Sequence, residues 1–166
     1  MSKFYSTKTY GNDRGLSCCF RQWRAYHSHC STLHGYAIGI KLIFGCDNLD
    51  DKNWVMDFGG LKDFKTWAEH MFDHTLIVAS DDPMLPFFKE MSAIVNLGSV
   101  NLESEVPYER GAICDLRIVD GVGCEMFAKM CFDKMTELLC NSGNSRVYVE
   151  SAEVFEHAGN SAIYEG

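Results

Sequence analysis

Reactive side chains are densest in residues 21–36. Three of the six histidines of the chain, His27, His29 and His34, lie there together with Cys30 and two arginines. Imidazole is a common metal ligand and carries protons near neutral pH, and a thiol beside a histidine or an arginine can be held as a thiolate. The segment is therefore either a site for metal or proton chemistry, or a surface loop that is merely rich in histidine.

Two smaller polar clusters lie further along the chain. Asp73 directly precedes His74, and a carboxylate can hold an imidazole in the tautomer that transfers protons. Glu156 begins a polar stretch that runs to residue 161, and a carboxylate in a pocket can accept paired N–H bonds from a planar heterocycle. Each cluster could equally be an ordinary polar helix end or a hairpin turn.

The apolar pattern predicts strands at both ends of the chain and two long helices between them. Helices are predicted over 60–72 and 124–140 from apolar residues at three- and four-residue spacing. A shorter helix is predicted over 84–91, followed by irregular chain or strands to residue 120. Strands are predicted in four ranges, the first of them a hairpin that turns at residues 11–15: 3–25, 36–46, 146–155 and 160–164.

This element order is typical of an α+β domain in which an antiparallel sheet is covered on one face by two helices. The length of 166 residues fits a single domain over 1–166. The edge strands of such a sheet must be paired or covered. Joining sheets edge to edge in an oligomer is one solution.

Composition limits the classes of partner. The net charge of −8 argues against broad nucleic-acid binding, which requires phosphate neutralisation. No apolar run approaches the roughly 20 residues needed to span a bilayer, and the N-terminus lacks the apolar core of a signal peptide, so a cytoplasmic location is expected. None of the eight cysteines forms a C-x-x-C pair. Most of these thiols are therefore expected to be reduced and buried.

Five short motifs, in order over residues 18–166, resemble those of the 6-pyruvoyl- and 6-carboxytetrahydropterin synthase family. The bacterial branch of that family carries C-x-x-x-H-G-H, D-F-x-x-L-K, L-D-H, a polar turn that opens the second helix, and a Glu eight residues before a Tyr. The matching segments here are Cys30-Ser-Thr-Leu-His34-Gly35-Tyr36, Asp57-Phe-Gly-Gly-Leu-Lys62, Phe72-Asp73-His74, Gly123-Cys124-Glu125, and Glu156 with Tyr164.

The resemblance implies a fold and an assembly. Family members adopt the tunnelling fold, or T-fold, in which a four-stranded antiparallel sheet carries two helices on one face. Three subunits join their sheets into a barrel, and two trimers usually stack into a homohexamer. The active site lies between subunits.

The resemblance also implies a lyase. Cys30 would be the catalytic thiol, Asp73 and His74 would be its partner dyad in proton transfer, and Glu156 would anchor the pterin ring. The implied substrate is 7,8-dihydroneopterin triphosphate. The bacterial branch converts it to 6-carboxytetrahydropterin on the route to queuosine and related 7-deazaguanines, and the animal branch converts it to 6-pyruvoyltetrahydropterin.

One departure from the family concerns zinc, which family members bind with three histidines. The first ligand position, four residues after Phe20, is Arg24 here, and the last is Tyr36, so only His34 remains. His27 or His29 could swing in beside His34 and restore a zinc site. Arg24 could instead bind the substrate and supply the positive charge of the missing metal. A third alternative is a pterin-binding paralogue with changed or lost chemistry.

Overall fold

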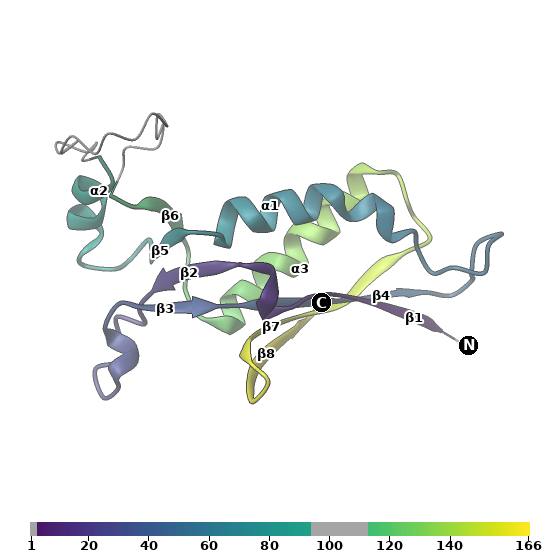
Figure 1. Ribbon diagram of the computed structural model, residues 1–166. Coiled ribbons are helices and arrows are strands. Elements are labelled where there is room, and N and C mark those ends of the chain that lie inside the picture. Colours follow the sequence, from purple (N-terminus) through teal and green to yellow (C-terminus); the bar gives the residue numbers. More distant parts are fainter. Residues whose placement is uncertain (1–2, 94–112) are drawn as a thin grey trace.

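The computed structural model describes residues 3–93 and 113–166. Its larger sheet is four-stranded and antiparallel throughout, as predicted. Two long helices, α1 (Lys62–Phe72) and α3 (Cys124–Asn141), lie over one face of this sheet (Figure 1). The strands follow the order β1 (Phe4–Tyr10), β4 (Gly39–Cys46), β7 (Tyr148–His157) and β8 (Asn160–Glu165).

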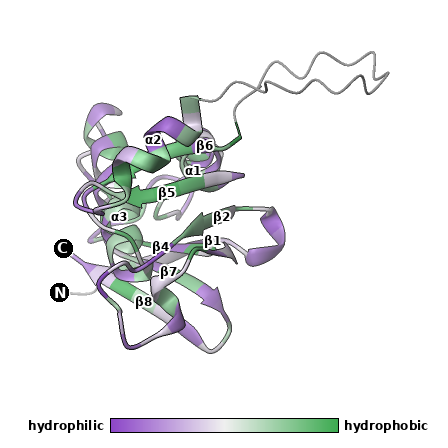
Figure 2. Ribbon diagram, turned by 90° about the vertical axis from the view of Figure 1, so that its left-hand side faces the viewer, coloured by the Kyte–Doolittle hydropathy of each residue, from purple (hydrophilic) through white to green (hydrophobic). Residues whose placement is uncertain are grey.

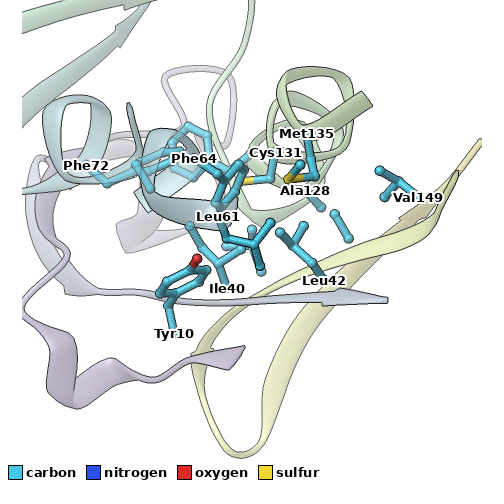
Figure 3. Close-up of a cluster of buried hydrophobic side chains, with 14 of the residues drawn as sticks. Tyr10, Ile40, Leu42, Leu61, Phe64, Phe72, Ala128, Cys131, Met135 and Val149 are labelled. Carbon is cyan, nitrogen blue, oxygen red and sulfur yellow. The ribbon is translucent and has the colours of Figure 1, made fainter. Parts of the chain in front are cut away.

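The main core lies between this sheet and the two helices. Ile40 and Leu42 project from β4 toward Phe64 of α1 and Cys131 and Met135 of α3 (Figure 3). All five side chains are at most 3% exposed, and burying a large apolar side chain contributes roughly 1.5–3 kcal/mol. The helical spacing seen in the sequence is therefore the spacing of the buried stripe on each helix. Figure 2 colours hydrophobic residues green, and green segments occur on the helices and strands that face one another.

A second sheet, which the sequence reading did not predict, lies beyond one end of the first. Its strands β3 (His34–Ala37), β2 (Ser17–Phe20), β5 (Thr75–Ala79) and β6 (Asp115–Val119) lie in that order. The β2–β5 and β5–β6 pairings are parallel. All five residues of β5 are buried, and such a continuous apolar run is typical of a strand covered on both faces.

A short helix and its cluster complete this second layer. Helix α2 (Leu85–Ala93) packs Phe88 against Leu76 and Val78 of β5. The helix predicted over 84–91 is thus confirmed. Strand β6 falls in the stretch for which irregular chain or strands are predicted, and residues 94–112 of that stretch lie outside the described residues.

The hairpin predicted within residues 3–25 is wrong. Strand β1 pairs with β4, and β2 pairs with β3, both antiparallel, so one long ribbon passes from the first sheet to the second. Between β1 and β2 the chain makes a 3-10 turn over Asn12–Arg14 and adopts a left-handed conformation at Gly15 (φ 82°). The turn steps the strand sideways without reversing it. Across from it, Ile38 alone separates β3 from β4 and donates to the carbonyl of Leu16 at 3.0 Å.

All eight cysteines are free thiols, as predicted. Their burial is lower than predicted, because only Cys18, Cys46 and Cys131 are fully buried and Cys140 is exposed.

Within residues 3–93 and 113–166, the structure contains no helix with the length and apolarity needed to cross a membrane.

Candidate active site

Tyr36 is at the centre of the densest group of reactive side chains. Its ring stacks on Phe20 of the neighbouring strand, with centroids 4.0 Å apart and planes 11° from parallel. Phe20 is 1% exposed and packs edge to face on Phe127 of α3. Offset-stacked and edge-to-face aromatic pairs of this kind add roughly 0.5–1.5 kcal/mol beyond the burial of their area. The Tyr36 ring is therefore fixed against the core, and its hydroxyl has one direction to point.

That hydroxyl lies 2.5 Å from Nε2 of His34, two residues earlier on β3. The other ring nitrogen of His34, Nδ1, lies 2.8 Å from the carbonyl oxygen of Thr32. Because a carbonyl can only accept, Nδ1 must carry the hydrogen of a neutral imidazole. Nε2 is then the acceptor, and the Tyr36 hydroxyl donates to it.

Glu156 approaches this pair from the larger sheet. It is the extra residue of a β-bulge, because Phe155 pairs with Ser161 and His157 with Asn160, which leaves Glu156 without a partner across the hairpin. Bulges of this kind re-aim a side chain and are frequent beside active sites. Asn12 fixes the place by donating to the carbonyls of both Ala37 (2.5 Å) and Glu156 (3.1 Å).

Electrostatics place Cys124 beside the same carboxylate. Burial first, and then the negative charge of Glu156, raise the pKa of Cys124 to about 12. The same two causes, in the same order, raise the pKa of Tyr36 to about 12. Both groups are thus neutral hydrogen-bond donors at physiological pH.

Cys30 reaches the group from the loop that joins β2 to β3. It lies in the 3-10 turn His29–Ser31, where its N–H donates to the Ser28 hydroxyl and its carbonyl accepts from the N–H of Gln22 (2.8 Å). Cys30 lies close enough to Tyr36 to be among the groups that raise the pKa of the Tyr36 hydroxyl. Five side chains thus form what we call the Tyr36 cluster: Cys30, His34, Tyr36, Cys124 and Glu156.

The start of α3 holds this loop in place. The side chain of Gln22 lies so close to Gly123 that a Cβ there would come within 2.5 Å of its Nε2 atom. Gly123 also has φ 112°, which a residue with a side chain rarely adopts. A glycine is therefore required where the loop meets the helix that carries Cys124.

Arg24 is already engaged elsewhere in the structure. Its guanidinium pairs with Asp81 at 2.8 Å, stacks on Trp23, and leaves the side chain 70% exposed. The indole N–H of Trp23 donates to the same carboxylate at 3.1 Å. The charge of Arg24 is thus balanced at the end of β5, and its assignment to substrate binding stays a prediction.

Asp73 and His74 form the hydrogen-bonded dyad that the sequence suggested. Nδ1 of His74 lies 2.6 Å from Oδ1 of Asp73, and the His74 side chain is 82% exposed. His74 has φ 56°, a conformation uncommon outside glycine. Its backbone N–H donates to Ser17 at 2.6 Å, which ties the dyad to the start of β2.

Hydrogen bonds from two side chains fix the last turn of α1, which directly precedes Asp73 and His74. The carbonyl of His70 accepts two hydrogen bonds from the guanidinium of Arg117, at 3.0 and 2.8 Å. The carbonyl of Met71 accepts from the hydroxyl of Thr75 at 2.9 Å. Carbonyls of the last helical turn have no partner within the helix. Side chains from β5 and β6 supply the partners here.

Within a single protomer, the Asp73–His74 dyad and Cys30 are not brought together. His74 is bonded to Ser17 at one end of β2, and Cys30 is bonded to Gln22 beyond the other end. Five residues of extended chain separate these two anchor points by roughly 16 Å, at about 3.3 Å per residue. Cys30 and the dyad are therefore anchored at opposite ends of β2.

The side chains of the zinc prediction do not fit a metal ion. Within the described residues, no group of three or more His, Cys, Asp or Glu side chains is arranged to hold one. Both nitrogens of His34 are engaged, as described above. His29 has its ring centroid 6.3 Å from that of His34, and both His27 and His29 are exposed. Zinc bound by His27, His29 and His34 stays a prediction without support from this arrangement.

Comparison with known proteins places the chain in a family. The family model described as 6-pyruvoyl tetrahydropterin synthase matches residues 12–166. The chain belongs to the 6-pyruvoyl tetrahydropterin synthase family. Its fold class is the T-fold of that family.

Curated relatives of this tetrahydropterin synthase family match over a limited region. A Rickettsia bellii protein named 6-carboxy-5,6,7,8-tetrahydropterin synthase is 34% identical over 58 residues, which are 34% of this chain and 42% of the relative. An Aquifex aeolicus protein of the same name is 32% identical over 63 residues, 38% of this chain and 39% of the relative. The chain thus spans about two fifths of the length of the curated relatives it matches.

Solved structures extend the likeness in fold to the whole chain. An uncharacterized protein from Wolinella succinogenes superposes with a TM-score of 0.74 at 21% identity, covering 99% of both chains. The Plasmodium falciparum 6-pyruvoyl tetrahydropterin synthase superposes with a TM-score of 0.62 at 18% identity, covering 100% of this chain and 99% of that one.

Two members of the Tyr36 cluster were not predicted as site residues from the sequence. Cys124 stood in a matched motif, yet only its position at the start of a helix was noted. Tyr36 was noted only as a lost zinc ligand. A signal was present for Tyr36 alone, because the family resemblance implies a histidine at that position; Cys124 is the unspecified middle residue of its motif.

Proposed function

We propose that this protein is a lyase of the 6-carboxytetrahydropterin synthase type. It acts on 7,8-dihydroneopterin triphosphate or a related pterin, in the formation of 7-deazaguanines such as queuosine. Membership of the family and the names of the matched relatives support the reaction class. The observation that carries the proposal is the Tyr36 cluster, which puts a thiol and a bulged carboxylate from distant parts of the chain around one position.

In this proposal the carboxylate of Glu156 holds the pterin ring by accepting two N–H bonds. Charge-assisted bidentate recognition of this kind is both strong and directional. The neutral Cys124 thiol, whose pKa is raised by burial and by the nearby charge of Glu156, orients that carboxylate in this proposal. Cys30 moves a proton on the side chain of the bound pterin.

A second protomer is needed to complete the proposed site. The dyad lies beyond the far end of β2 from Cys30, so the Asp73 and His74 that act on a given Cys30 come from a neighbouring copy. In the larger sheet, β1 and β8 are the edge strands, each paired on one side within the described residues, and unpaired edges invite pairing with another chain.

An apolar groove beside β1 supports such an assembly. A cavity of about 530 Å³ lies between β1 and the 49–58 loop, and its lining includes Phe4, Tyr5 and Trp54. These three side chains are 41–48% exposed. Exposed apolar patches of this kind mark association surfaces. The proposed occupant is a second copy of this chain, in a homotrimer or homohexamer.

A second candidate function is a pterin-binding paralogue whose chemistry is changed or lost. The observation that favours it is the pair of altered positions. Arg24 is engaged with Asp81, and Tyr36 donates to the one histidine that remains of the family's zinc triad. Under this alternative the protein binds the pterin but does not turn it over.

A single-turnover assay with product analysis separates the two functions. Enzyme in excess over 7,8-dihydroneopterin triphosphate is expected to consume it, and Cys30→Ala is expected to abolish consumption while binding of 7,8-dihydroneopterin persists. Cys140→Ala, at an exposed thiol near the end of α3, is the matched control and should react normally. Binding without consumption by the unmodified protein would favour the paralogue. Full consumption by Cys30→Ala would remove Cys30 from the mechanism.

A further inference from the structure

His34 has the surroundings of a metal ligand, but a hydroxyl lies where a metal would bind. A metal-bound histidine usually donates its second ring N–H to a carboxylate or a carbonyl, which fixes the tautomer. Nδ1 of His34 makes such a bond to Thr32. The lone pair that this tautomer leaves on Nε2 receives the Tyr36 hydroxyl hydrogen.

The packing of Tyr36 keeps the hydroxyl at that position. On β3 the register opposes Tyr36 to Cys18, and His34 to Phe20, so the Tyr36 ring lies diagonally across from Phe20 and stacks on it. To free Nε2 of His34, the Tyr36 side chain would have to leave this stack. The hydroxyl therefore competes for Nε2 from a fixed position, whereas a metal would need further ligands.

The side chains that could supply those further ligands are otherwise placed. Arg24 pairs with Asp81, and a guanidinium, being always protonated, cannot bind a metal. His29 and His27 are exposed on the loop. Within the described residues, no three of these groups converge on one point.

We propose that the Tyr36 hydroxyl takes the place of a metal ion on His34, so that this protein binds its pterin without zinc at the Tyr36 cluster. Because the Tyr36 hydrogen is used by His34, its oxygen offers only lone pairs to a ligand. Tyr36 is then a neutral acceptor for an N–H or O–H donor of the bound pterin, beside the charged acceptor Glu156. This contact rests on the proposed function, whereas the replacement of zinc does not.

The metal content of the purified protein tests the replacement. The full chain is produced with zinc supplied, purified without chelator, and compared with His34→Ala by elemental analysis. The expected result is less than about one zinc per ten chains in the unmodified protein. Near-stoichiometric zinc that His34→Ala loses would overturn the proposal. Zinc that His34→Ala retains is held by other residues, and the proposal stands.

Calorimetric titration with 7,8-dihydroneopterin tests the ligand contact. Tyr36→Phe keeps the ring on Phe20 and removes only the oxygen, so the dissociation constant is expected to rise about five- to ten-fold, the value of one hydrogen bond. Tyr26→Phe, on the loop between β2 and β3 at a residue that is 78% exposed, is the matched control and should bind as the unmodified protein does. Equal affinity of Tyr36→Phe and Tyr26→Phe would overturn the contact.

The two measurements also separate this inference from the proposed function. If the unmodified protein does not bind 7,8-dihydroneopterin at all, the proposed function and the ligand contact both fail. The zinc measurement then still decides whether Tyr36 has replaced the metal. If the pterin binds and zinc is present on His34, the proposed function survives and the replacement fails.

Discussion

The loop that carries Cys30 should depend on one buried ion pair. The guanidinium of Arg21 binds the carboxylate of Asp82 in a two-pronged manner, with Nε to Oδ2 at 2.9 Å and Nη2 to Oδ1 at 2.6 Å. The Asp82 side chain is 1% exposed and that of Arg21 is 22% exposed. Asp82 also accepts from the N–H of Met84 just before α2. Arg21 therefore connects the end of β2 to the start of α2.

The cost of breaking this pair follows from what would remain. Arg21→Met keeps the aliphatic stem and leaves Asp82 buried with one backbone donor. Removing one partner of a buried ion pair costs about 3–5 kcal/mol, because the other charge stays desolvated. Arg24→Met is the matched control, three residues on. Its ion pair with Asp81 is 70% and 48% exposed, and an exposed pair is worth about 0–1 kcal/mol.

The pH dependence gives a second measure of the same pair. Burial raises the pKa of Asp82, but the hydrogen bonds from Arg21 and Met84 and the charge of Arg21 together outweigh it, so the pKa is lowered overall. A lowered pKa stabilises the fold above the unfolded value of about 3.9, and the contribution is lost as pH falls through the folded pKa. In Arg21→Met, burial is left to raise the pKa. The stability difference between the two proteins should therefore shrink as pH falls, and it should vanish only below the lowered folded pKa of Asp82.

Urea denaturation at matched protein concentration, at pH 7 and below pH 4, checks both expectations. Far-ultraviolet circular dichroism follows unfolding, and the free energy of unfolding is compared among the three proteins. An Arg21→Met cost at pH 7 no larger than that of Arg24→Met would refute the reasoning. A cost that stays constant with pH would show that lost packing, and not the stranded carboxylate, destabilises the variant.

Three further outcomes are expected. Glu156→Gln should weaken binding of 7,8-dihydroneopterin by about 1–3 kcal/mol in calorimetric titration, whereas Glu153→Gln, on the same strand and paired with a lysine, should not; equal affinities would reject the anchor role. Arg117→Met removes both donors to the His70 carbonyl in the last turn of α1, so kcat should fall several-fold while pterin affinity holds; an unchanged kcat would show that the dyad does not depend on this cap. Phe127→Ala, at a fully buried ring, should cost about 3–5 kcal/mol in urea denaturation, against less than 1 kcal/mol for Phe87→Ala at an exposed one; a small Phe127 effect would contradict its place in the core.

The larger sheet and the long helices could be predicted because their periodicity follows from a single buried face. Phe64, Cys131 and Met135 recur at helical spacing since each helix covers the sheet along one stripe. The second sheet could not be predicted in this way, because a strand buried on both faces has no alternation to detect. The run Thr75–Ala79 is short and uniformly apolar. Periodicity alone cannot distinguish such a run from part of a helix.

The long ribbon formed by β1 and β2 with β3 and β4 was predicted wrongly for a different reason. Gly11 to Gly15 has the composition of a hairpin turn, and glycine together with polar residues is the usual signal for reversal. Whether such a turn reverses the chain depends on the partner of the next strand, which is set by pairing more than ten residues away. Here both β1 and β2 pair with the 34–46 segment. The composition of residues 11–15 gives no information about that pairing.

The sequence could predict which residues belong to the candidate site, but not which of them lie together in space. Sequence singled out Cys30, Glu156 and the Asp73–His74 dyad. It could not show that the first two share a cluster while the dyad is anchored at the opposite end of β2 from Cys30. Spacing along the chain gives no distance across two sheets. The bulge that isolates Glu156 is likewise invisible in sequence, because it is defined by the register of the facing strand.

Arg24 and Tyr36 stand at two positions where the family resemblance implies zinc-binding histidines, and each of them has a partner of its own in the structure. Arg24 balances Asp81, and Tyr36 is bonded to His34. Returning Tyr36 to histidine would free Nε2 of His34 but would leave the first ligand position as a guanidinium engaged at the end of β5. Returning Arg24 to histidine as well would remove the cation that balances Asp81, which sits beside the buried Arg21–Asp82 pair. The proposed zinc-free arrangement is thus supported by the contacts of both Arg24 and Tyr36, and restoring a histidine site would require changes at both positions together.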